Sequence, residues 1–168
     1  MRPPIAIEDL ALSLPPKGRL AGLDLGAKTI GVAISDVERR LASPLKTLPR
    51  GAFMRDAEGL IAIFSEFEVA GIVIGLPLDL DGRDTPRAQS TRAFGRNLSM
   101  RTGLPVAFWD ERFSTAAVTR SLIANDVSRA RRARVVDRMA AAYILQGALD
   151  RLADVLAGDP KGDGAGRL

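Results

Sequence analysis

The continuous apolar run "AGIVIGLP", residues 70–77, constrains the fold of this chain most strongly. It has the length of a β-strand, but it lacks the alternation of polar and apolar residues that marks a strand with one solvated face. A strand that is apolar throughout is typical of a parallel sheet covered by helices. The run therefore predicts a buried parallel strand in an α/β protein.

The segments around this run predict further strands and helices. Strands are expected in "RLAGLDLG" and "TIGVAISD", joined by a tight turn, in the proline-containing edge segment "ASPLKTLPR", and in "PVAFWD". Helices are expected in "FMRDAEGLIAIFSEF", after the capping pair Thr85–Pro86, in "STAAVTRSLIAND", and in "RVVDRMAAAYILQGALDRLADVL". The order β-β-β-α-β-α-β-α-α predicts a mixed five-stranded sheet flanked by helices.

The length of 168 residues favours a single domain. We expect this domain to span residues 19–157, with residues 1–18 as an N-terminal extension and residues 158–168 as a flexible tail. No apolar run approaches the ~18 residues of a membrane-spanning helix. The first residues also lack the unbroken apolar stretch of a signal peptide, so a cytoplasmic location is expected.

The chain contains no cysteine and no histidine, which limits its chemistry. Disulfides, thiolate chemistry, Ser-His-Asp triads and zinc sites of the usual His/Cys kind are excluded. Any catalysis is left to carboxylates, hydroxyl groups, lysine and arginine. Carboxylate ligands favour hard cations such as Mg²⁺ or Mn²⁺.

Three carboxylates occupy positions that suggest a common site. Asp24 lies inside an apolar strand, Glu111 stands at the carboxyl end of another, and Asp137 lies early in the last helix beside its apolar stripe. A buried ionised aspartate is costly unless it is paired or bound to a metal. Clustered carboxylates repel one another, and a pair of divalent ions, which can also clamp a phosphodiester, would relieve that repulsion.

Each of these acids also has an ordinary structural interpretation. Asp24 is explained by turn capping, Glu111 by an ion pair with Arg112 or a helix cap, and Asp137 by the dipole of its helix. Asp110 and Glu111 point to opposite faces if the strand continues through them, so only one is expected at the site, and we expect Glu111.

Positive charge is concentrated in residues 81–140, which carry 12 arginines against 6 acidic residues. The planar fork of arginine suits phosphate, so a nucleic-acid-binding surface is the functional interpretation. A solvated helix surface is the alternative. The candidate nucleic-acid-binding residues are Lys28, Arg92, Arg96, Arg112, Arg132 and Arg134.

The three acids, with Lys28, Arg112 and Arg134, fall into motifs that resemble the YqgF family of Holliday-junction-resolvase-like proteins, also called pre-16S ribosomal RNA nucleases. The motifs are "DLGAKTIGVA" with Asp24 and Lys28, "GLPLDLDG" at residues 75–82, D-E-R-x-S-T from Asp110 to Thr115, and "RVVDRMAAAYILQ" with Asp137. The resemblance spans roughly residues 19–157. Many members carry lysine two positions before the last aspartate, where this chain has Val135, with Arg134 one step earlier.

The resemblance implies a ribonuclease H-like fold and a metal-dependent endonuclease. Asp24, Glu111 and Asp137 would be the catalytic ligands of Mg²⁺ or Mn²⁺, as two ions. The implied reaction is processing of the 5′ end of pre-16S ribosomal RNA, with RNA and the ribosomal precursor particle as partners and no membrane.

Other functions stay open at the level of sequence. A Holliday junction resolvase-type endonuclease acting on structured DNA would use the same chemistry. A non-catalytic RNA-binding factor for ribosome assembly would keep the same fold. A kinase or ATPase of the actin type shares the D-x-G opening but needs two domains. The sequence does not indicate the oligomeric state.

Overall fold

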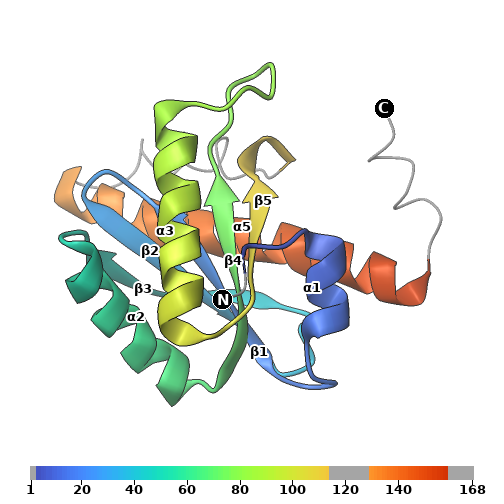
Figure 1. Ribbon diagram of the computed structural model, residues 1–168. Helices are drawn as coiled ribbons and strands as arrows, with labels where there is room; N and C mark the ends of the chain where they lie inside the picture. Colours follow the sequence, from blue (N-terminus) through green and yellow to red (C-terminus); the bar gives the residue numbers. More distant parts are fainter. Residues whose placement is uncertain (1–2, 114–128, 159–168) are drawn as a thin grey trace.

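The computed structural model describes residues 3–113 and 129–158, with the backbone alone over residues 129–136. Its centre is a five-stranded mixed sheet in the order β3-β2-β1-β4-β5, with helices on both faces (Figure 1). The prediction of a mixed five-stranded sheet flanked by helices is confirmed.

The first three strands form an antiparallel meander. β1 (Arg19–Leu25) pairs with β2 (Thr29–Ser35), and β2 pairs with β3 (Ala42–Pro49) at the edge of the sheet. On the other side of β1, β4 (Val69–Leu76) and then β5 (Val106–Asp110) add in parallel. β4 is the apolar run noted above, and it is buried along almost its whole length.

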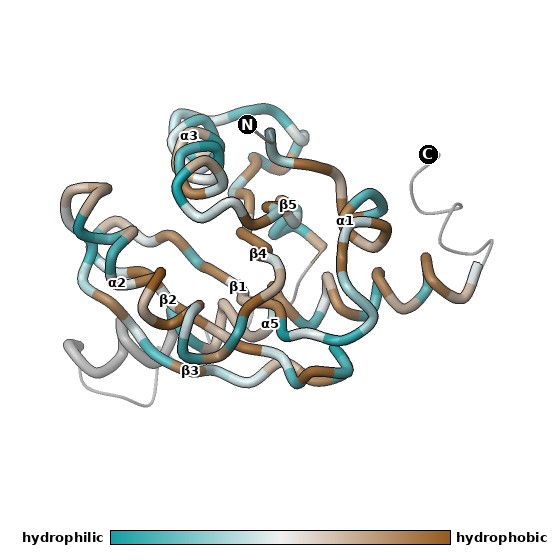
Figure 2. Tube along the Cα trace, turned by 60° about the horizontal axis from the view of Figure 1, so that its bottom comes forward, coloured by the Kyte–Doolittle hydropathy of each residue, from teal (hydrophilic) through white to brown (hydrophobic). Residues whose placement is uncertain are grey.

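One face of the sheet is covered by α2 (Phe53–Glu66) and α3 (Pro86–Thr102). The other face is covered by α5 (Arg129–Ala157), which lies behind the sheet in Figure 1, and by α1 (Ile7–Ser13). Figure 2 shows apolar residues along the central strands and mainly polar residues in the segment that leads into α3.

Alternate residues of β1 divide between two hydrophobic cores. Ala21 and Leu23 pack in the core beneath α2 and α3, whereas Leu20 packs in the core beneath α5. Because side chains alternate along a strand, the even-numbered positions of β1 point toward α5.

The predicted start of α3 is confirmed in detail. The Thr85 hydroxyl accepts a hydrogen bond from the backbone N–H of Ala88 at 3.0 Å, and Pro86 follows as the first helical residue. Gly103, with φ of 73°, ends the helix in the left-handed region that favours glycine.

Residues expected as an N-terminal extension pack against the sheet and α5. Ile5 forms a parallel bridge with Ala107 of β5, and Ile7 and Leu10 of α1 are buried in the core beneath α5. Glu8 of α1 also pairs with an arginine of α5. This helix was not predicted from the sequence.

Two further predictions fall wholly or mainly outside the described residues. The helix predicted in "STAAVTRSLIAND" lies there, as does the tail from residue 159 onward. The last helix begins at Arg129, before the start predicted at Arg134. Among the described helices, none combines the length and the apolar character needed to cross a membrane.

Candidate active site

Asp24 lies near the carboxyl end of β1, on the face of the sheet that α5 covers. A Cβ atom placed on Gly22, two residues earlier on the same face, would lie 2.6 Å from Cβ of Leu145 in α5. Asp24 is accordingly buried, with 1% of its surface exposed. The strand therefore holds this carboxylate rigidly beneath the helix.

A glycine flanks Asp24 on each neighbouring strand. Gly31 of β2 is its partner in the antiparallel register. In the parallel register Leu23 pairs with Ile74, so the next residue of β4, Gly75, follows beside Asp24. These two glycines present no side chain on the α5 face, and other groups can approach the sheet closely on both sides of Asp24.

Asp137 of α5 occupies the space over Gly31. A Cβ atom on Gly31 would lie 2.8 Å from the backbone nitrogen of Arg138 and closer still to the carbonyl of Asp137. The Thr29 hydroxyl donates a hydrogen bond to the Asp137 carboxylate. The helix backbone and this side chain are thus fixed against the end of the β1–β2 hairpin.

Glu111 occupies the space over Gly75 on the other side. It begins the 3₁₀ turn η1 (Glu111–Phe113), directly after β5. A Cβ atom on Gly75 would lie 2.7 Å from the Glu111 Oε1 and 2.5 Å from Cδ1 of Ile144 in α5. Three elements, β1, η1 and α5, therefore bring the three predicted acids to one face at one end of the sheet.

Asp110 is engaged elsewhere, with Arg112. The Arg112 guanidinium lies 2.6 Å from the Asp110 carboxylate, and the backbone N–H of Arg112 also donates to Asp110 at 3.0 Å. This side-chain hydrogen bond raises the pKa of Arg112. In the structure Asp110, not Glu111, is the bidentate ion-pair partner of Arg112.

The acids face the same region without forming a closed set of ligands. Over residues 3–113 and 129–158, no three or more acidic side chains are grouped so that they could hold a metal ion. The chemistry of the three carboxylates nevertheless suits a hard divalent cation, since all the donors are oxygen atoms. The glycines beside Asp24 supply the close approach that such a site needs.

The predicted nucleic-acid-binding residues differ in their surroundings. Arg92 pairs with Asp84 at 3.2 Å, and Arg112 pairs with Asp110. Lys28 and Arg96 are exposed, on the β1–β2 turn and on α3. The side chains of Arg132 and Arg134 lie outside the described residues.

Two further arginines, which the sequence did not single out, contact the end of β1. Arg50 donates to the carbonyl of Gly26 at 2.6 Å, and Arg87 donates to the carbonyl of Leu25 at 3.1 Å. Arg87 lies within the arginine-rich block, which was the available signal. Nothing in the sequence marks Arg50, which simply follows an edge strand.

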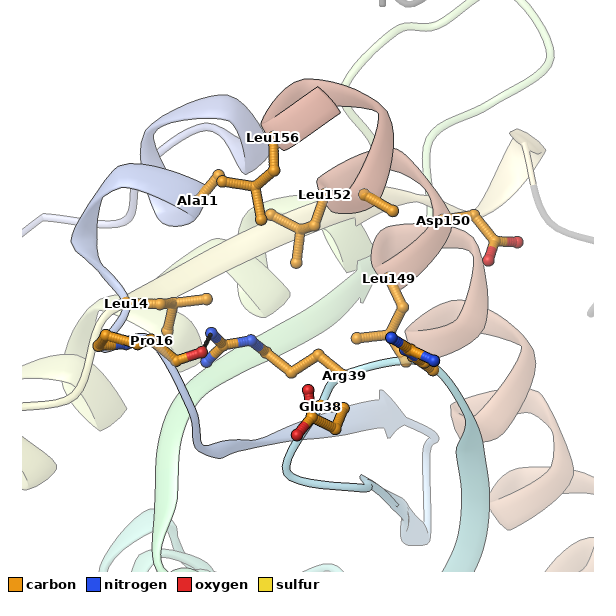
Figure 3. Close-up of a pocket in the computed structure, with 11 residues that line it drawn as sticks. Ala11, Leu14, Pro16, Glu38, Arg39, Leu149, Asp150, Leu152 and Leu156 are labelled. Atoms are coloured by element: carbon orange, nitrogen blue, oxygen red, sulfur yellow. Dashed lines mark hydrogen bonds between the residues drawn. The ribbon is translucent and has the colours of Figure 1, made fainter. Parts of the chain in front are cut away.

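A separate hollow of ≈ 330 Å³ lies toward the other end of α5 (Figure 3). Apolar residues of α1 and α5, such as Ala11, Leu152 and Leu156, line it. Arg39 crosses it and donates to the carbonyl of Pro16 at 3.0 Å. Leu152 is about 22 Å along the helix from Asp137 at 1.5 Å per residue, so this hollow is distinct from the acidic site.

Two relatives are similar to this chain over most of its length. A relative from Beijerinckia indica subsp. indica, described as "Putative pre-16S rRNA nuclease", is 59% identical over 149 residues, covering 89% of this chain and 90% of its own. A relative from Bradyrhizobium sp. with the same description is 60% identical over 151 residues, covering 90% of this chain and 94% of its own.

A solved structure shows the same fold. T. thermophilus RuvC in complex with a Holliday junction substrate matches with a TM-score of 0.51 at 12% identity, covering 79% of this chain and 93% of RuvC. The predicted ribonuclease H-like fold is thereby confirmed. A family model described as "RuvX: Holliday junction resolvase" matches residues 18–151. Together with the relatives, this match confirms the resemblance to YqgF proteins, and the chain belongs to the RuvX family.

Proposed function

We propose that this protein is a metal-dependent nuclease that processes the 5′ end of pre-16S ribosomal RNA by hydrolysing phosphodiester bonds. The observation that carries the proposal is the approach of Glu111 and Asp137 to either side of buried Asp24, over Gly75 and Gly31. The description of relatives that are 59% and 60% identical over most of the chain supports RNA as the substrate.

In this proposal Asp24, Glu111 and Asp137 hold two divalent cations, Mg²⁺ or Mn²⁺. Bound cations would neutralise the carboxylates and stabilise the oxygen of the attacking water and the leaving oxygen of the phosphodiester. The chain's own contribution is positioning. β1 fixes Asp24, the Thr29 hydroxyl orients the Asp137 carboxylate, and the turn after β5 holds Glu111 over Gly75.

The proposed substrate and its cellular location are as follows. The substrate is the single-stranded RNA that flanks the structured end of 16S ribosomal RNA in the ribosomal precursor particle, in the cytoplasm. The junction-bound RuvC structure is similar to this chain in fold alone, at 12% identity, so its DNA substrate is not assigned to this chain.

A competition assay tests the reaction and the substrate together. Purified protein receives equal concentrations of a precursor RNA with its 5′ flank and a four-way DNA junction, with Mn²⁺ or Mg²⁺. We expect cleavage in the RNA flank, and loss of that cleavage in Asp24→Asn. Paired nicks across the junction with intact RNA would overturn the choice of substrate.

Thermal unfolding separates the enzyme from a non-catalytic assembly factor. A cation that binds only the folded state stabilises it by about 2.7 kcal/mol when the cation concentration is one hundred times the dissociation constant. We expect the melting temperature of the wild type, and not that of Asp24→Asn, to rise with Mn²⁺. Equal shifts in both proteins, together with no cleavage of either substrate, would favour the assembly factor.

A further inference from the structure

We propose that Arg50 and Arg87 bind backbone phosphates of the substrate strand at the carboxyl end of β1, next to the acids. This inference rests on the proposed function, and it names the residues that hold the strand there. It shifts the phosphate contacts toward two arginines outside the set predicted from sequence.

Arg50 is anchored to the β1–β2 turn at two points. Its backbone N–H donates to the carbonyl of Lys28 at 2.9 Å, and its guanidinium donates to the carbonyl of Gly26 at 2.6 Å. The guanidinium also lies 5.8 Å from the centre of the Phe94 ring. These contacts hold the positive charge of Arg50 beside Gly26, which is two residues after Asp24.

Arg87 reaches the same strand end from α3. Its guanidinium donates to the carbonyl of Leu25 at 3.1 Å, and the residue lies in the first turn of the helix, just after Pro86. Each arginine uses one N–H group in these strand-end contacts, and a guanidinium has five. Donors therefore remain for an anion at this edge.

The positive charge of these two arginines is not compensated locally. Across the described parts of the chain, no carboxylate lies within 4.0 Å of either guanidinium, whereas Arg92 and Arg112 are paired with Asp84 and Asp110. Free guanidinium groups fixed by neutral carbonyls are suited to phosphate, since binding does not require an existing ion pair to break.

The two arginines approach the strand end from the side opposite the acids. Leu25 and Phe94 belong to the core beneath α2 and α3, while Asp137 and Ile144 belong to α5 on the other face. A nucleic-acid strand that crosses this edge would meet carboxylates on one side and guanidinium groups on the other. The arginines would then fix phosphates beside the one that reacts.

Binding of single-stranded RNA, measured by fluorescence anisotropy in EDTA over a series of KCl concentrations, tests this inference. For Arg87→Ala and Arg50→Ala we expect severalfold weaker binding and a log–log salt slope smaller by about 0.7 per lost contact. Arg101→Ala, an exposed residue at the far end of α3, is the matched control and should keep the wild-type slope.

Circular dichroism spectra of each variant are compared with the wild type to test whether the variant is folded. Arg87 is exposed, so Arg87→Ala keeps the test decisive if Arg50→Ala unfolds. A folded Arg87→Ala protein with the wild-type salt slope would overturn the inference. Because binding is measured without divalent ions, a protein that shows the arginine-dependent slope but never cleaves RNA would contradict the proposed function and leave this inference standing.

Discussion

Replacing Gly75 with alanine should reduce cleavage while the protein still folds. The new methyl group would lie 2.7 Å from Oε1 of Glu111 and 2.5 Å from Cδ1 of Ile144. Ordinary contact begins at 3.4 Å, so the Glu111 oxygen must withdraw by about 0.7 Å. Cγ of Glu111 would also lie at 3.1 Å, and Ile144 is fully buried, so the overpacking should cost about 1–3 kcal/mol.

Activity should fall as well, because Glu111 is displaced from beside Asp24. A misplacement of this size costs on the order of 10²-fold in rate. Urea unfolding and initial rates of RNA cleavage measure the two effects separately. Gly59→Ala in α2 is the matched control: its methyl group would meet Leu48 at 3.4 Å, and stability should rise by up to about 1 kcal/mol with no change in rate. Wild-type cleavage by a folded Gly75→Ala protein would refute the placement of Glu111 at the site.

Four other substitutions test the acids, a hydrogen bond at the site and one turn. Glu111→Gln should abolish RNA cleavage while Asp110→Asn retains most of it, and the reverse ranking would identify Asp110 as the catalytic acid. Thr29→Val removes the hydrogen bond to Asp137. More Mn²⁺ should then be needed for half-maximal cleavage, and the free energy of unfolding should fall by about 1 kcal/mol. An unchanged Mn²⁺ requirement would argue against a role of Thr29 in orienting Asp137. The hydrogen bond from the backbone N–H of Leu41 is the largest cause that lowers the pKa of Asp36 below its ordinary 3.8; burial opposes it, and the backbone N–H of Arg40 adds to the lowering. The ionised Asp36 therefore stabilises the fold above that pH and ceases to do so as the pH falls through its lower folded value. Asp36→Asn should accordingly reduce the free energy of unfolding at neutral pH, with the difference vanishing in strong acid; an equal loss at both extremes would contradict this.

The succession of strands along the chain could be predicted because apolar runs mark the buried strands directly. Asp24 could be singled out for the same reason, since an acid inside such a run is costly without a partner. The glycines on both sides of Asp24 could not be foreseen as neighbours. Gly31 and Gly75 are far apart in the sequence, and only the pairing of β2 and β4 with β1 brings them together. The roles of the three acids as metal ligands stay predictions.

The arginines were harder to interpret because their partners depend on the tertiary fold. Arg92 and Arg112 belong to a basic block, yet each meets a carboxylate in the folded chain. Arg50 and Arg87 gain their position from the two carbonyls at which β1 ends. A charge count along the sequence cannot show which guanidinium groups are already paired.

The packing of α1 has a consequence for the order in which this chain can assemble during synthesis. Ile5 pairs with Ala107 of β5, and Ile7 and Leu10 lie in one core with the second half of α5, which comes far later in the sequence. The β1–β2 hairpin needs only local pairing and can form early, whereas these first apolar residues must wait until the last helix has left the ribosome. A nascent or truncated chain that lacks the second half of α5 would therefore expose them, and they would be available to chaperones or to aggregation.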